Sequence, residues 1–451
     1  MSLPPATDST PAGASVRGAA VSRLNRKDLR DLYLNAPIHE LGRLAFERTE
    51  RLHPEDYRTY VVDRNINYAN WCTARCIFCN FKADPPDAPI GRKDLPVGYT
   101  LSYEQIGRKI EELLAVGGTQ ILMQGGLVPG DGPAGLPFDW YLGLLRLIKQ
   151  KYPAIHVHAF SPPEIFAFHQ VYRMSIRDVL ARLQEAGLET VPGGGAEILS
   201  DRVRAKISVG KTNTAEWLEV MRQCHLLGMQ TSCTMMFGHL ETLDERLEHL
   251  ELLRDLQDES LARNNGGGFG AFICWPFQPA GTPLGRVKPL PLEETPKRRN
   301  AERSKPPSAK TPKIGDERSA RAGEADDIPH AAGSGINLKS EIPNPKSARP
   351  LNDGRHLLLA DAHEYLTMLA LGRLALDNIP NIQSSWVTMG PKIGQLALFF
   401  GANDMGSVMM EENVVSAAGT SYRLNETEIR RLIADAGWRP RKRDYYYRLI
   451  D

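Results

Sequence analysis

The 451-residue sequence has almost no net charge, no long apolar run and few cysteines. A formal net charge of +1 argues against a nucleic-acid-binding protein that depends on a basic field. No segment approaches the ~18 consecutive apolar residues that a membrane-spanning helix needs. Six cysteines, three of them crowded together, do not make the disulfide framework of a secreted protein. We therefore expect a cytoplasmic protein with no nucleic-acid partner and no membrane span.

Two segments have very few large apolar residues. Residues 1–24 are rich in proline, alanine, serine and threonine and lack the apolar core of a signal peptide, which predicts a disordered leader. Residues 291–354 cannot bury enough surface to offset the entropy of ordering them, so they predict a disordered insertion. Their first part, 297–313, holds seven basic residues and one acidic residue. This basic run predicts a solvated loop, and binding of an anionic partner is the alternative.

Strand-like and helix-like segments alternate along the rest of the chain. The expected strands are 59–70, 119–124, 155–160, 188–192, 229–238, 269–277, 381–387 and 397–403. Amphipathic segments separate most of them, and one of these segments opens with Thr242 and Glu245 at the spacing of a capping box. Eight strands that alternate with helices favour an α/β fold of the (β/α)8 barrel type over an open doubly wound sheet.

The predicted barrel has an extension at each end. An N-terminal helical segment, 25–58, leads into a barrel core at 59–290. After the insertion, residues 355–451 complete the barrel and form a C-terminal extension with a terminal helix at 426–437. The remaining residues, RPRKRDYYYRLID, are basic and aromatic.

Three cysteines, Cys72, Cys76 and Cys79, fall within eight positions in the motif CTARCIFC. Structural zinc would need a fourth ligand, and the nearest histidine, His53, lies nineteen residues upstream. The further cysteine of a two-cluster ferredoxin pattern is missing as well. Three thiolates on a 4Fe-4S cluster would leave one iron open for a ligand. Zinc and unligated free thiols stay as alternatives. We expect the distant Cys224, Cys233 and Cys274 to be buried thiols in apolar surroundings.

The C-x3-C-x2-C spacing resembles the radical S-adenosylmethionine (radical SAM) superfamily. The resemblance implies that S-adenosyl-L-methionine chelates the open iron of a 4Fe-4S cluster, which cleaves it to a 5′-deoxyadenosyl radical. It also implies that Phe78 packs near the adenine and that the strand end Gln124, Gly125 and Gly126 contacts the amino group of S-adenosylmethionine. The simpler interpretations are that Phe78 is a core aromatic residue and that Gln124, Gly125 and Gly126 form a tight strand-to-helix turn.

Other polar residues follow the expected strands on the face where barrel enzymes carry their sites. Ser161 and Glu164 could hold a ribose, and Glu197 could bind the ribose hydroxyls of the cofactor, although a solvated carboxylate at a helix start is an alternative. Glu241 and Gln278 follow later strands in the same way.

Longer blocks narrow the resemblance to the cyclic dehypoxanthine futalosine synthase family of menaquinone biosynthesis. They include ILMQGGLVP at 121–129, HVHAFSPPEI at 156–165 and, most specifically, the segment 377–420. The resemblance covers most of the chain from about residue 25, but the insertion departs from the family pattern. It implies dehypoxanthine futalosine as the small-molecule substrate, hydrogen abstraction at its ribose C4′, ring closure onto the aromatic ring, and an external one-electron donor such as flavodoxin or ferredoxin.

Two other functions stay open from the sequence. A sister enzyme, aminofutalosine synthase or a deazaflavin synthase subunit, would use the same cofactor on another substrate. An electron-transfer or scaffold protein would hold a cluster that never meets S-adenosylmethionine.

The catalytic candidates are His158, His239 and Asp404, and any of these, or His156, could remove the last proton. His156 shares one side of its strand with His158, and both are alternatively buried core histidines. Lys392 could pair with a substrate carboxylate, and Asn403 could hold ribose hydroxyls. Trp386 lies in the same block, and the methionines Met405, Met409 and Met410 predict core filling.

Overall fold

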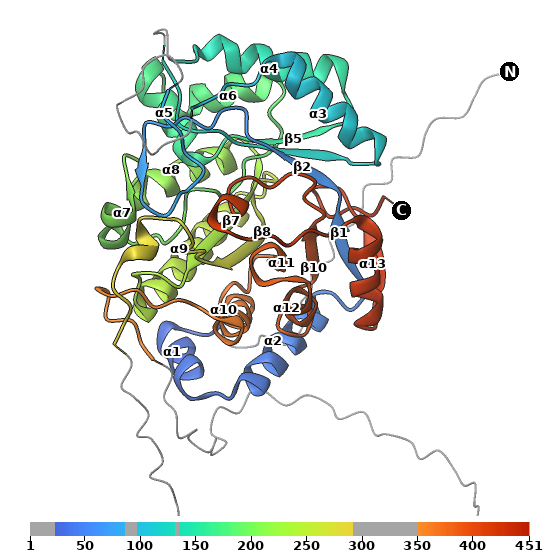
Figure 1. The fold of residues 1–451 in the computed structure, drawn as a ribbon. Helices are drawn as coiled ribbons and strands as arrows, with labels where there is room; N and C mark the ends of the chain where they lie inside the picture. Colours follow the sequence, from blue (N-terminus) through green and yellow to red (C-terminus); the bar gives the residue numbers. More distant parts are fainter. Residues whose placement is uncertain (1–22, 86–96, 131–134, 292–349, 451) are drawn as a thin grey trace, which may run out of the picture. The chain divides into compact units, whose positions relative to one another are not determined.

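The computed structural model describes residues 23–85, 97–130, 135–291 and 350–450 (Figure 1). The predicted leader and insertion lie for the most part outside these residues. All described residues except Pro291 belong to one compact unit, Arg23–Leu290 with Asn344–Asp451. At the edges of the two predicted segments, Arg23 pairs with Asp258 and Asp377, and Asn352 donates a hydrogen bond to the carbonyl oxygen of His239.

Parallel strands form the centre of the unit. In chain order they are β1 (Tyr57–Val61) with its continuation β2 (Asp63–Ile66), β4 (Gln120–Met123), β5 (His156–Ala159), β7 (Gln230–Phe237), β8 (Gly268–Pro276), β9 (Asn381–Gln383) and β10 (Asp404–Ser407). One sheet runs β1-β10-β9-β8-β7, and another runs β2-β4-β5.

Two isolated bridges close the gap between β5 and β7. His158 pairs with Thr190, and Val191 pairs with Thr231, both in parallel. Because β2 continues β1, the ring of eight parallel segments is complete, as in a (β/α)8 barrel. The predicted barrel is therefore confirmed, with residues 190–191 as its short fourth strand.

Helices lie around the strands (Figure 1). Those between the barrel strands are α3 (Tyr103–Ala115), α4 (Phe138–Lys151), α5 (Pro162–Tyr172), α6 (Ile176–Ala186), α7 (Asp201–Ile207), α8 (Thr214–Leu226), α9 (Leu243–Leu261), α10 (Ala362–Ala375), α11 (Trp386–Met389) and α12 (Pro391–Leu396). Helix α9 begins with the predicted capping box of Thr242 and Glu245. Before the barrel, α1 (Arg26–Asn35) and α2 (Ile38–Leu52) pack against α9 and α10. Single 3-10 turns occur at Leu284–Arg286, Ala397–Phe399 and Ser416–Ala418.

The last two barrel strands differ from their predicted ranges. The predicted strand 397–403 begins with the 3-10 turn Ala397–Phe399, and β10 starts only at Asp404. The apolar residues of that run pack sideways, because Leu398 is buried in the core and the ring of Phe400 lies against Gly42 of α2. The predicted strand 381–387 ends at Gln383 and turns into α11.

The C-terminal segment covers the start of the first strand. Helix α13 (Glu426–Asp435) is followed by β11 (Arg439–Lys442), which pairs in parallel with β1. There β11 takes the place beside β1 that β4 takes beside β2. Residues 443–450 then form a tight hairpin, in which Arg443 pairs with Leu449 and the amide of Arg443 donates to the carbonyl oxygen of Tyr60.

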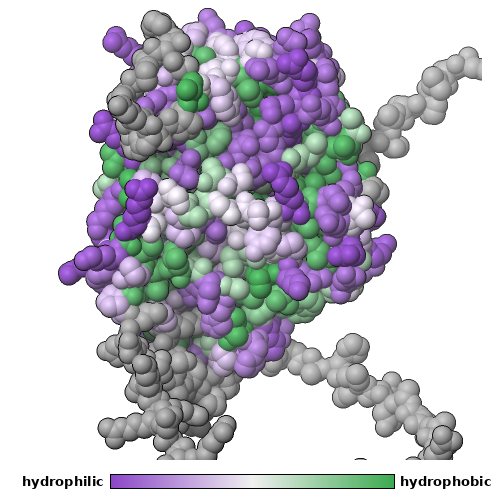
Figure 2. Space-filling model, in the orientation of Figure 1, coloured by the Kyte–Doolittle hydropathy of each residue, from purple (hydrophilic) through white to green (hydrophobic). Residues whose placement is uncertain are grey.

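The core of the unit is the packing layer between the strands and the surrounding helices, including Ile121, Val157, Leu247, Phe272 and Leu369. Hydrophilic residues gather over α3 and α4 on the face drawn in Figure 2, with hydrophobic residues in small groups elsewhere on that face. Within the described part of the chain, no helix combines the length and apolar character needed to cross a bilayer.

Candidate active site

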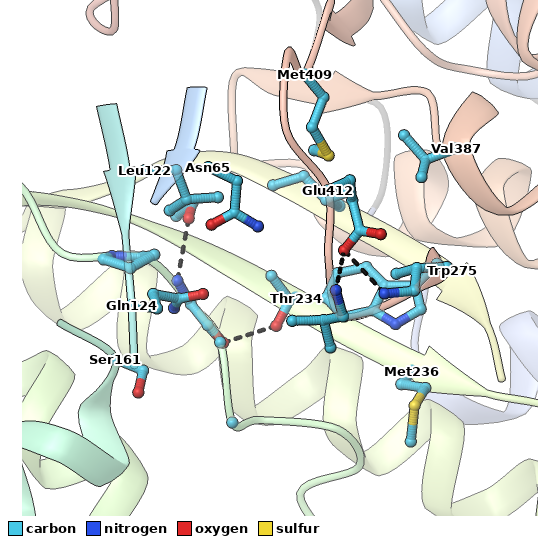
Figure 3. A pocket seen from close by; sticks show the side chains of 18 of the residues that line it. Asn65, Leu122, Gln124, Ser161, Thr234, Met236, Trp275, Val387, Met409 and Glu412 are labelled. Carbon is cyan, nitrogen blue, oxygen red and sulfur yellow. Dashed lines mark hydrogen bonds between the residues drawn. The ribbon is translucent and has the colours of Figure 1, made fainter. Parts of the chain in front are cut away.

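A cavity of about 440 Å³ lies inside the barrel. Alternate residues of the strands line it, which places them on the inner face of the barrel. They are Asp63 and Asn65 on β2, Gln120 and Leu122 on β4, Ser232, Thr234 and Met236 on β7, and Ile273 and Trp275 on β8. Figure 3 shows Asn65, Leu122, Gln124 and Ser161 facing Thr234, Met236 and Trp275 across the cavity, with Met409 and Glu412 above them.

The cysteine loop lies at the carboxyl end of β2 and is held by neighbouring segments. Its short strand β3 (Arg75–Cys76) pairs antiparallel with β6 (Ser208–Val209), directly after α7. The amide of Ile77 donates to the carbonyl oxygen of Ile207, and the amide of Leu284 donates to the carbonyl oxygen of Ile77. Backbone pairing on both sides thus fixes the loop without using its thiols.

The thiols of Cys72, Cys76 and Cys79 all line the cavity, and none forms a disulfide. Burial raises the pKa of Cys72, although the Leu127 amide donates to its Sγ at 3.2 Å and opposes that shift. Burial also raises the pKa of Cys76 to about 12, and the positive charge of Lys211 opposes that shift. Nearby positive charge therefore favours ionisation of the Cys72 and Cys76 thiols against the effect of burial.

Lys211 supplies a positive charge beside the cysteine loop. Its Nζ lies 2.9 Å from Glu197 Oε1 and 5.3 Å from the centre of the Phe78 ring. Burial alone would lower the pKa of Lys211, but Glu197 and the thiol of Cys76 raise it above its ordinary value. The side chain is therefore a cation at neutral pH.

Glu197 has a rare backbone conformation and an unpaired oxygen. Its φ of 42° lies in the left-handed region, which a residue with a Cβ seldom adopts. The residue is 5% exposed, and its Oε2 has no hydrogen-bond partner among the described residues. A buried carboxylate oxygen without a partner is costly, so Oε2 is suited to a ligand that donates a hydrogen bond.

The strand end at Gln124, Gly125 and Gly126 approaches the cysteine loop closely. A Cβ on Gly126 would lie 1.8 Å from the carbonyl oxygen of Trp71, and one on Gly125 would lie 2.4 Å from the Tyr68 ring. Glycine is therefore required at both positions. All three residues line the cavity, and the Gln124 carbonyl accepts a hydrogen bond from the Asn67 side chain.

Glu164 holds this strand end from behind. Its Oε1 accepts hydrogen bonds from the Tyr68 hydroxyl at 2.6 Å and from the Gly125 amide at 3.1 Å. Its Oε2 accepts from both the amide and the hydroxyl of Ser161, at 2.7 and 2.6 Å. Burial raises the pKa of Glu164, and these hydrogen bonds oppose the shift. All four contacts are internal, so Glu164 positions Gly125 and Ser161. Glu164 itself also lines the cavity, and its contact with a ribose, which the sequence led us to expect, stays a prediction.

A group of polar residues, here called the polar floor, lines another part of the cavity and is made of Asp63, Asn65, Gln120, His158, Gln383, Ser407, Arg443, Tyr445 and Tyr447. The C-terminal hairpin contributes the last three. Tyr445 stacks on the ring of His156 at 4.7 Å, and the Tyr447 hydroxyl accepts a hydrogen bond from Gln383 at 2.9 Å. Tyr447 also lines a second hollow below the floor, so its ring separates that hollow from the barrel cavity.

Of the catalytic candidates, only His158 lines the cavity. Its Nδ1 lies 2.8 Å from the Thr190 hydroxyl, which also contacts His156, and burial holds the pKa of His158 well below its ordinary value. His239 is fully buried away from the cavity wall. Its Nε2 lies 3.0 Å from the Met236 carbonyl oxygen and its Nδ1 lies 2.9 Å from Glu241, so His239 serves the fold.

Asp404 lies behind the cavity wall, contrary to the expectation of a catalytic role. It is fully buried and pairs with Arg443 through Nε at 2.6 Å and Nη2 at 3.0 Å. Asn403 is likewise outside the wall, because its Oδ1 accepts from Arg373 and from the Ile382 amide. Lys392 is exposed at the surface and does not reach the cavity.

The remaining candidates fall on both sides of the wall. Phe78, Ser161, Glu197, Gln278, Trp386 and Met409 line the cavity, whereas His156, Glu241, Met405 and Met410 are not among the described residues that line it. Cys224, Cys233 and Cys274 are buried in the core, where no shared cavity brings them together.

Sequence reasoning missed Lys211 and most of the polar floor. One signal was present, because Asp63, Asn65 and Asn67 alternate along the predicted first strand, which places these polar groups on one face. No local sequence pattern identified Lys211, Arg443, Tyr445 or Tyr447 as cavity residues. Each of them lies far in sequence from most of the residues that it meets at the cavity.

Comparisons with known proteins agree with this geometry. A model of the radical SAM superfamily matches residues 66–253, and one of the CofH/MqnC C-terminal region matches residues 355–451. The cyclic dehypoxanthine futalosine synthase of Halalkalibacterium halodurans is 37% identical over 97% of this chain and 94% of that protein. The chain belongs to the radical SAM superfamily.

Two further relatives of this radical SAM enzyme carry different names. The cyclic dehypoxanthine futalosine synthase of Streptomyces coelicolor is 33% identical over 96% of this chain and 86% of that protein. The 5-amino-6-(D-ribitylamino)uracil–L-tyrosine 4-hydroxyphenyl transferase 1 of Methanosarcina mazei is 32% identical over 92% of this chain and 88% of that protein. The family is therefore shared by enzymes with different named reactions.

Solved structures share the fold of this radical SAM enzyme. Methylornithine synthase superposes with a TM-score of 0.55 at 15% identity, covering 93% of this chain and 94% of that one. The FeFe-hydrogenase maturase HydG from Carboxydothermus hydrogenoformans gives 0.53 at 14% identity, covering 94% and 80%. At these identities the likeness concerns the fold.

Membership of the superfamily implies a 4Fe-4S cluster and S-adenosylmethionine, and the residues present fit both groups. Three free thiols line one cavity beside the Lys211 cation, and Glu197 presents an unpaired buried oxygen a short way along the wall. No set of three described His, Cys, Asp or Glu side chains converges on a single metal ion. A cubane does not need such convergence, because each thiolate binds a different iron.

Proposed function

We propose that this radical SAM enzyme cyclises dehypoxanthine futalosine in menaquinone biosynthesis. The observation that carries the proposal is the one barrel cavity, which the cysteine loop lines at one end and a polar floor at the other. The 37% identity with the Halalkalibacterium cyclic dehypoxanthine futalosine synthase, against 31–33% with three relatives named transferases, supports this substrate.

The cofactor roles follow from the cavity wall. Cys72, Cys76 and Cys79 bind the 4Fe-4S cluster, which, once bound and reduced, supplies the electron that splits S-adenosylmethionine into methionine and a 5′-deoxyadenosyl radical. Gly125 and Gly126 let the strand end pack closely against Tyr68 and Trp71, because neither has a Cβ, and this packing brings their backbone to the cavity wall beside the cysteine loop. The Gln124 backbone suits the ammonium group of the cofactor.

Two further residues complete this end of the cavity. Glu197 Oε2 accepts hydrogen bonds from ribose hydroxyls of the cofactor, since no described residue uses that oxygen. The Phe78 ring packs beside the adenine.

The chain's remaining task is to orient the substrate and exclude water. The reaction requires the ribose C4′ near the radical and near the aromatic ring that C4′ then joins, so the cavity must hold all three groups in van der Waals contact. The interior strand residues and the C-terminal hairpin enclose that space. Tyr447 closes the floor against the hollow below it.

His158 is the proposed base for the final proton loss. Burial keeps its imidazole neutral at physiological pH, since its pKa lies well below the ordinary value. With Nδ1 held by Thr190, Nε2 is the nitrogen that takes the proton. The accompanying electron would pass from the substrate to the oxidised form of an external one-electron carrier such as flavodoxin or ferredoxin, and the reduced form of such a carrier would supply the electron that begins each turnover. We expect this reaction to take place in the cytoplasm.

A second candidate function has support of its own. The relatives named 5-amino-6-(D-ribitylamino)uracil–L-tyrosine 4-hydroxyphenyl transferase match this chain at 31–33% identity, close to the second cyclase. That reaction would join a tyrosine-derived phenol to a ribityl-bearing pyrimidine. Aminofutalosine synthesis, with the same cofactor, would leave both reactions of the assay below without their product.

The deciding experiment is anaerobic turnover of the reconstituted holoenzyme with S-adenosylmethionine and a chemical reductant. Separate reactions contain dehypoxanthine futalosine, or 5-amino-6-(D-ribitylamino)uracil with tyrosine, and products are read by mass spectrometry. We expect cyclised product and 5′-deoxyadenosine in equal amounts in the first reaction only. Formation of 5′-deoxyadenosine without cyclised product would contradict the cyclase, and product in the second reaction would establish the transferase instead.

A further inference from the structure

The floor of the barrel cavity contains buried polar atoms that the protein does not satisfy. We propose that Asp63, Asn65 and Gln120 form the subsite that binds the sugar hydroxyls of the substrate. This inference rests on the proposed function, because it assigns part of that substrate to a place in the cavity.

The three residues share the inner face of two adjacent strands. Asp63 pairs with Gln120 in the register of β2 and β4, and Asn65 lies two residues further along β2 on the same side. All three line the cavity and are at least nine-tenths buried, with exposures of 5%, 7% and 6% for Asp63, Asn65 and Gln120. In Figure 3, Asn65 lies beside Leu122 at the cavity wall.

Two amide oxygens in this group have no partner among the described residues, Asn65 Oδ1 and Gln120 Oε1. The orientation of Gln120 is fixed, because its Nε2 donates to Asp63 Oδ2 at 2.9 Å. Its Oε1 must therefore face away from Asp63 as an acceptor. The other oxygen of Asp63 accepts a hydrogen bond from the Ser407 hydroxyl.

The subsite is rich in acceptors, which selects the chemistry of its ligand. The nearby cation, Arg443, is paired with Asp404, to which it donates two hydrogen bonds at 2.6 and 3.0 Å. Every cation of the described cavity wall is similarly engaged, Lys211 with Glu197 and Lys82 with the Ala74 carbonyl oxygen. An anionic group has no free partner here, whereas hydroxyl groups can donate to Asn65, Gln120 and Asp63.

The position within the barrel agrees with this assignment. Gln120 begins β4, and Gln124 follows the end of the same strand beside the cysteine loop. Four residues of extended chain span about 13 Å. That length leaves room for a nucleoside-sized group between the cluster end of the cavity and a sugar held at the floor.

The test measures binding without turnover. The reconstituted holoenzyme with S-adenosylmethionine, without reductant, is titrated anaerobically with dehypoxanthine futalosine and with its 2′-deoxy and 3′-deoxy ribosyl analogues. The variants are Asn65→Ala and Gln120→Met, and Asn378→Ala is the matched control, because Asn378 binds Arg254 and Asp258 outside the cavity. We expect Asn65→Ala and Gln120→Met to weaken binding of the natural substrate about three- to tenfold.

The analogues separate a direct contact from a general effect. For each variant, at least one deoxy analogue should bind the variant and the intact enzyme equally well. That analogue lacks the hydroxyl whose hydrogen bond the substitution removes, so the substitution has nothing further to lose. Asn65→Ala should also keep or raise the thermal midpoint, since it removes a buried unpaired group. Unchanged substrate affinity in both variants, or equal losses for all three compounds, would overturn the subsite.

Failure of the proposed function gives a different result. If the intact enzyme does not bind dehypoxanthine futalosine, the same variants are titrated with 5-amino-6-(D-ribitylamino)uracil, which carries a ribityl chain. Weaker binding by Asn65→Ala would then support the subsite while rejecting the cyclase. Unchanged binding by the variants, or no binding of either compound by the intact enzyme, would overturn the subsite as well.

Discussion

The carboxylate of Glu164 accepts a hydrogen bond from the Tyr68 hydroxyl at 2.6 Å, directly behind the glycines that end β4. The same oxygen accepts the Gly125 amide, and the other oxygen accepts the amide and hydroxyl of Ser161. One buried carboxylate thus ties the first, second and third strand ends together beside the cysteine loop.

Glu164→Gln should loosen this arrangement. A carboxamide has only one acceptor oxygen, so either Gly125 or Ser161 is left with a donor facing an amino group, at a cost of about 1–3 kcal/mol. We expect weaker S-adenosylmethionine binding, measured anaerobically by calorimetry, together with a lower free energy of unfolding. Tyr68→Phe is the control, because it removes one donor and leaves the other three in place. Equal S-adenosylmethionine affinity in Glu164→Gln and the intact enzyme would contradict a positioning role.

Replacing any one of Cys72, Cys76 and Cys79 by alanine should abolish cluster binding without unfolding the barrel. Backbone pairing of β3 with β6 holds the loop independently of the thiols, so far-ultraviolet circular dichroism should be unchanged. Cluster loss is measured as protein-bound iron and visible absorption after reconstitution. Cys274→Ala changes a core thiol and should retain full iron. A full iron complement in a loop variant would disprove the cluster assignment.

Arg443→Met should destabilise the protein strongly, because it leaves the carboxylate of Asp404 buried without its cation. Breaking a buried pair in this way costs about 3–5 kcal/mol, measurable by urea unfolding. Arg439→Ala removes an ion pair with Asp56 from the same segment, but both of those side chains are mostly exposed. That control should have little effect. Similar losses in the two variants would show that the hairpin is not anchored through Asp404.

Stability should fall as the pH drops below about 6.5, the ordinary histidine value. Burial lowers the pKa of His225 to about 3 and of His249 to about 3, so the folded protein keeps them neutral where the unfolded chain takes up protons. The unfolded state then binds more protons, and the free energy of unfolding decreases with falling pH. Each of these histidines removes about 1.4 kcal/mol at pH 5.5.

Urea unfolding at pH 7.5 and 5.5 checks this pH dependence. His225→Gln removes one of the titrating groups, while its amide still reaches the hydroxyl groups of Ser260 and Thr231 that the imidazole contacts. The pH effect should shrink by the share of one histidine. A pH effect as large in the variant as in the intact protein would exclude His225 as a contributor.

Much of the barrel was predictable because its strands and helices carry local patterns. Apolar strands that end in glycine, such as 119–126, and the capping box at Thr242 identify element type and boundaries from a few neighbouring residues. The eighth strand was misplaced for the opposite reason. It has only four residues, Asp404–Ser407, of which Met405 alone is large and apolar, while the apolar run before it packs against α2.

The site was predictable only where spacing carries chemistry. The cysteine spacing and the glycine pair led to one end of the cavity, but strand-end position alone did not tell which way a side chain points. His239 follows β7 in sequence, yet its ring turns into the protein toward Met236 and Glu241. Tyr445 and Tyr447 reach the floor through contacts with β5 and β9, which no local pattern encodes.

The pairing of β1 with β10 and β11 sets an order of events during synthesis. Thr59 and Asp404, which are hydrogen bonded across the first pair, are 345 positions apart in the chain. A ribosome therefore exposes β1 long before either of its partners exists, with both of its edges unpaired. Such an edge invites pairing with other chains. The first strand therefore stays open to such pairing until β10 and β11 have been made.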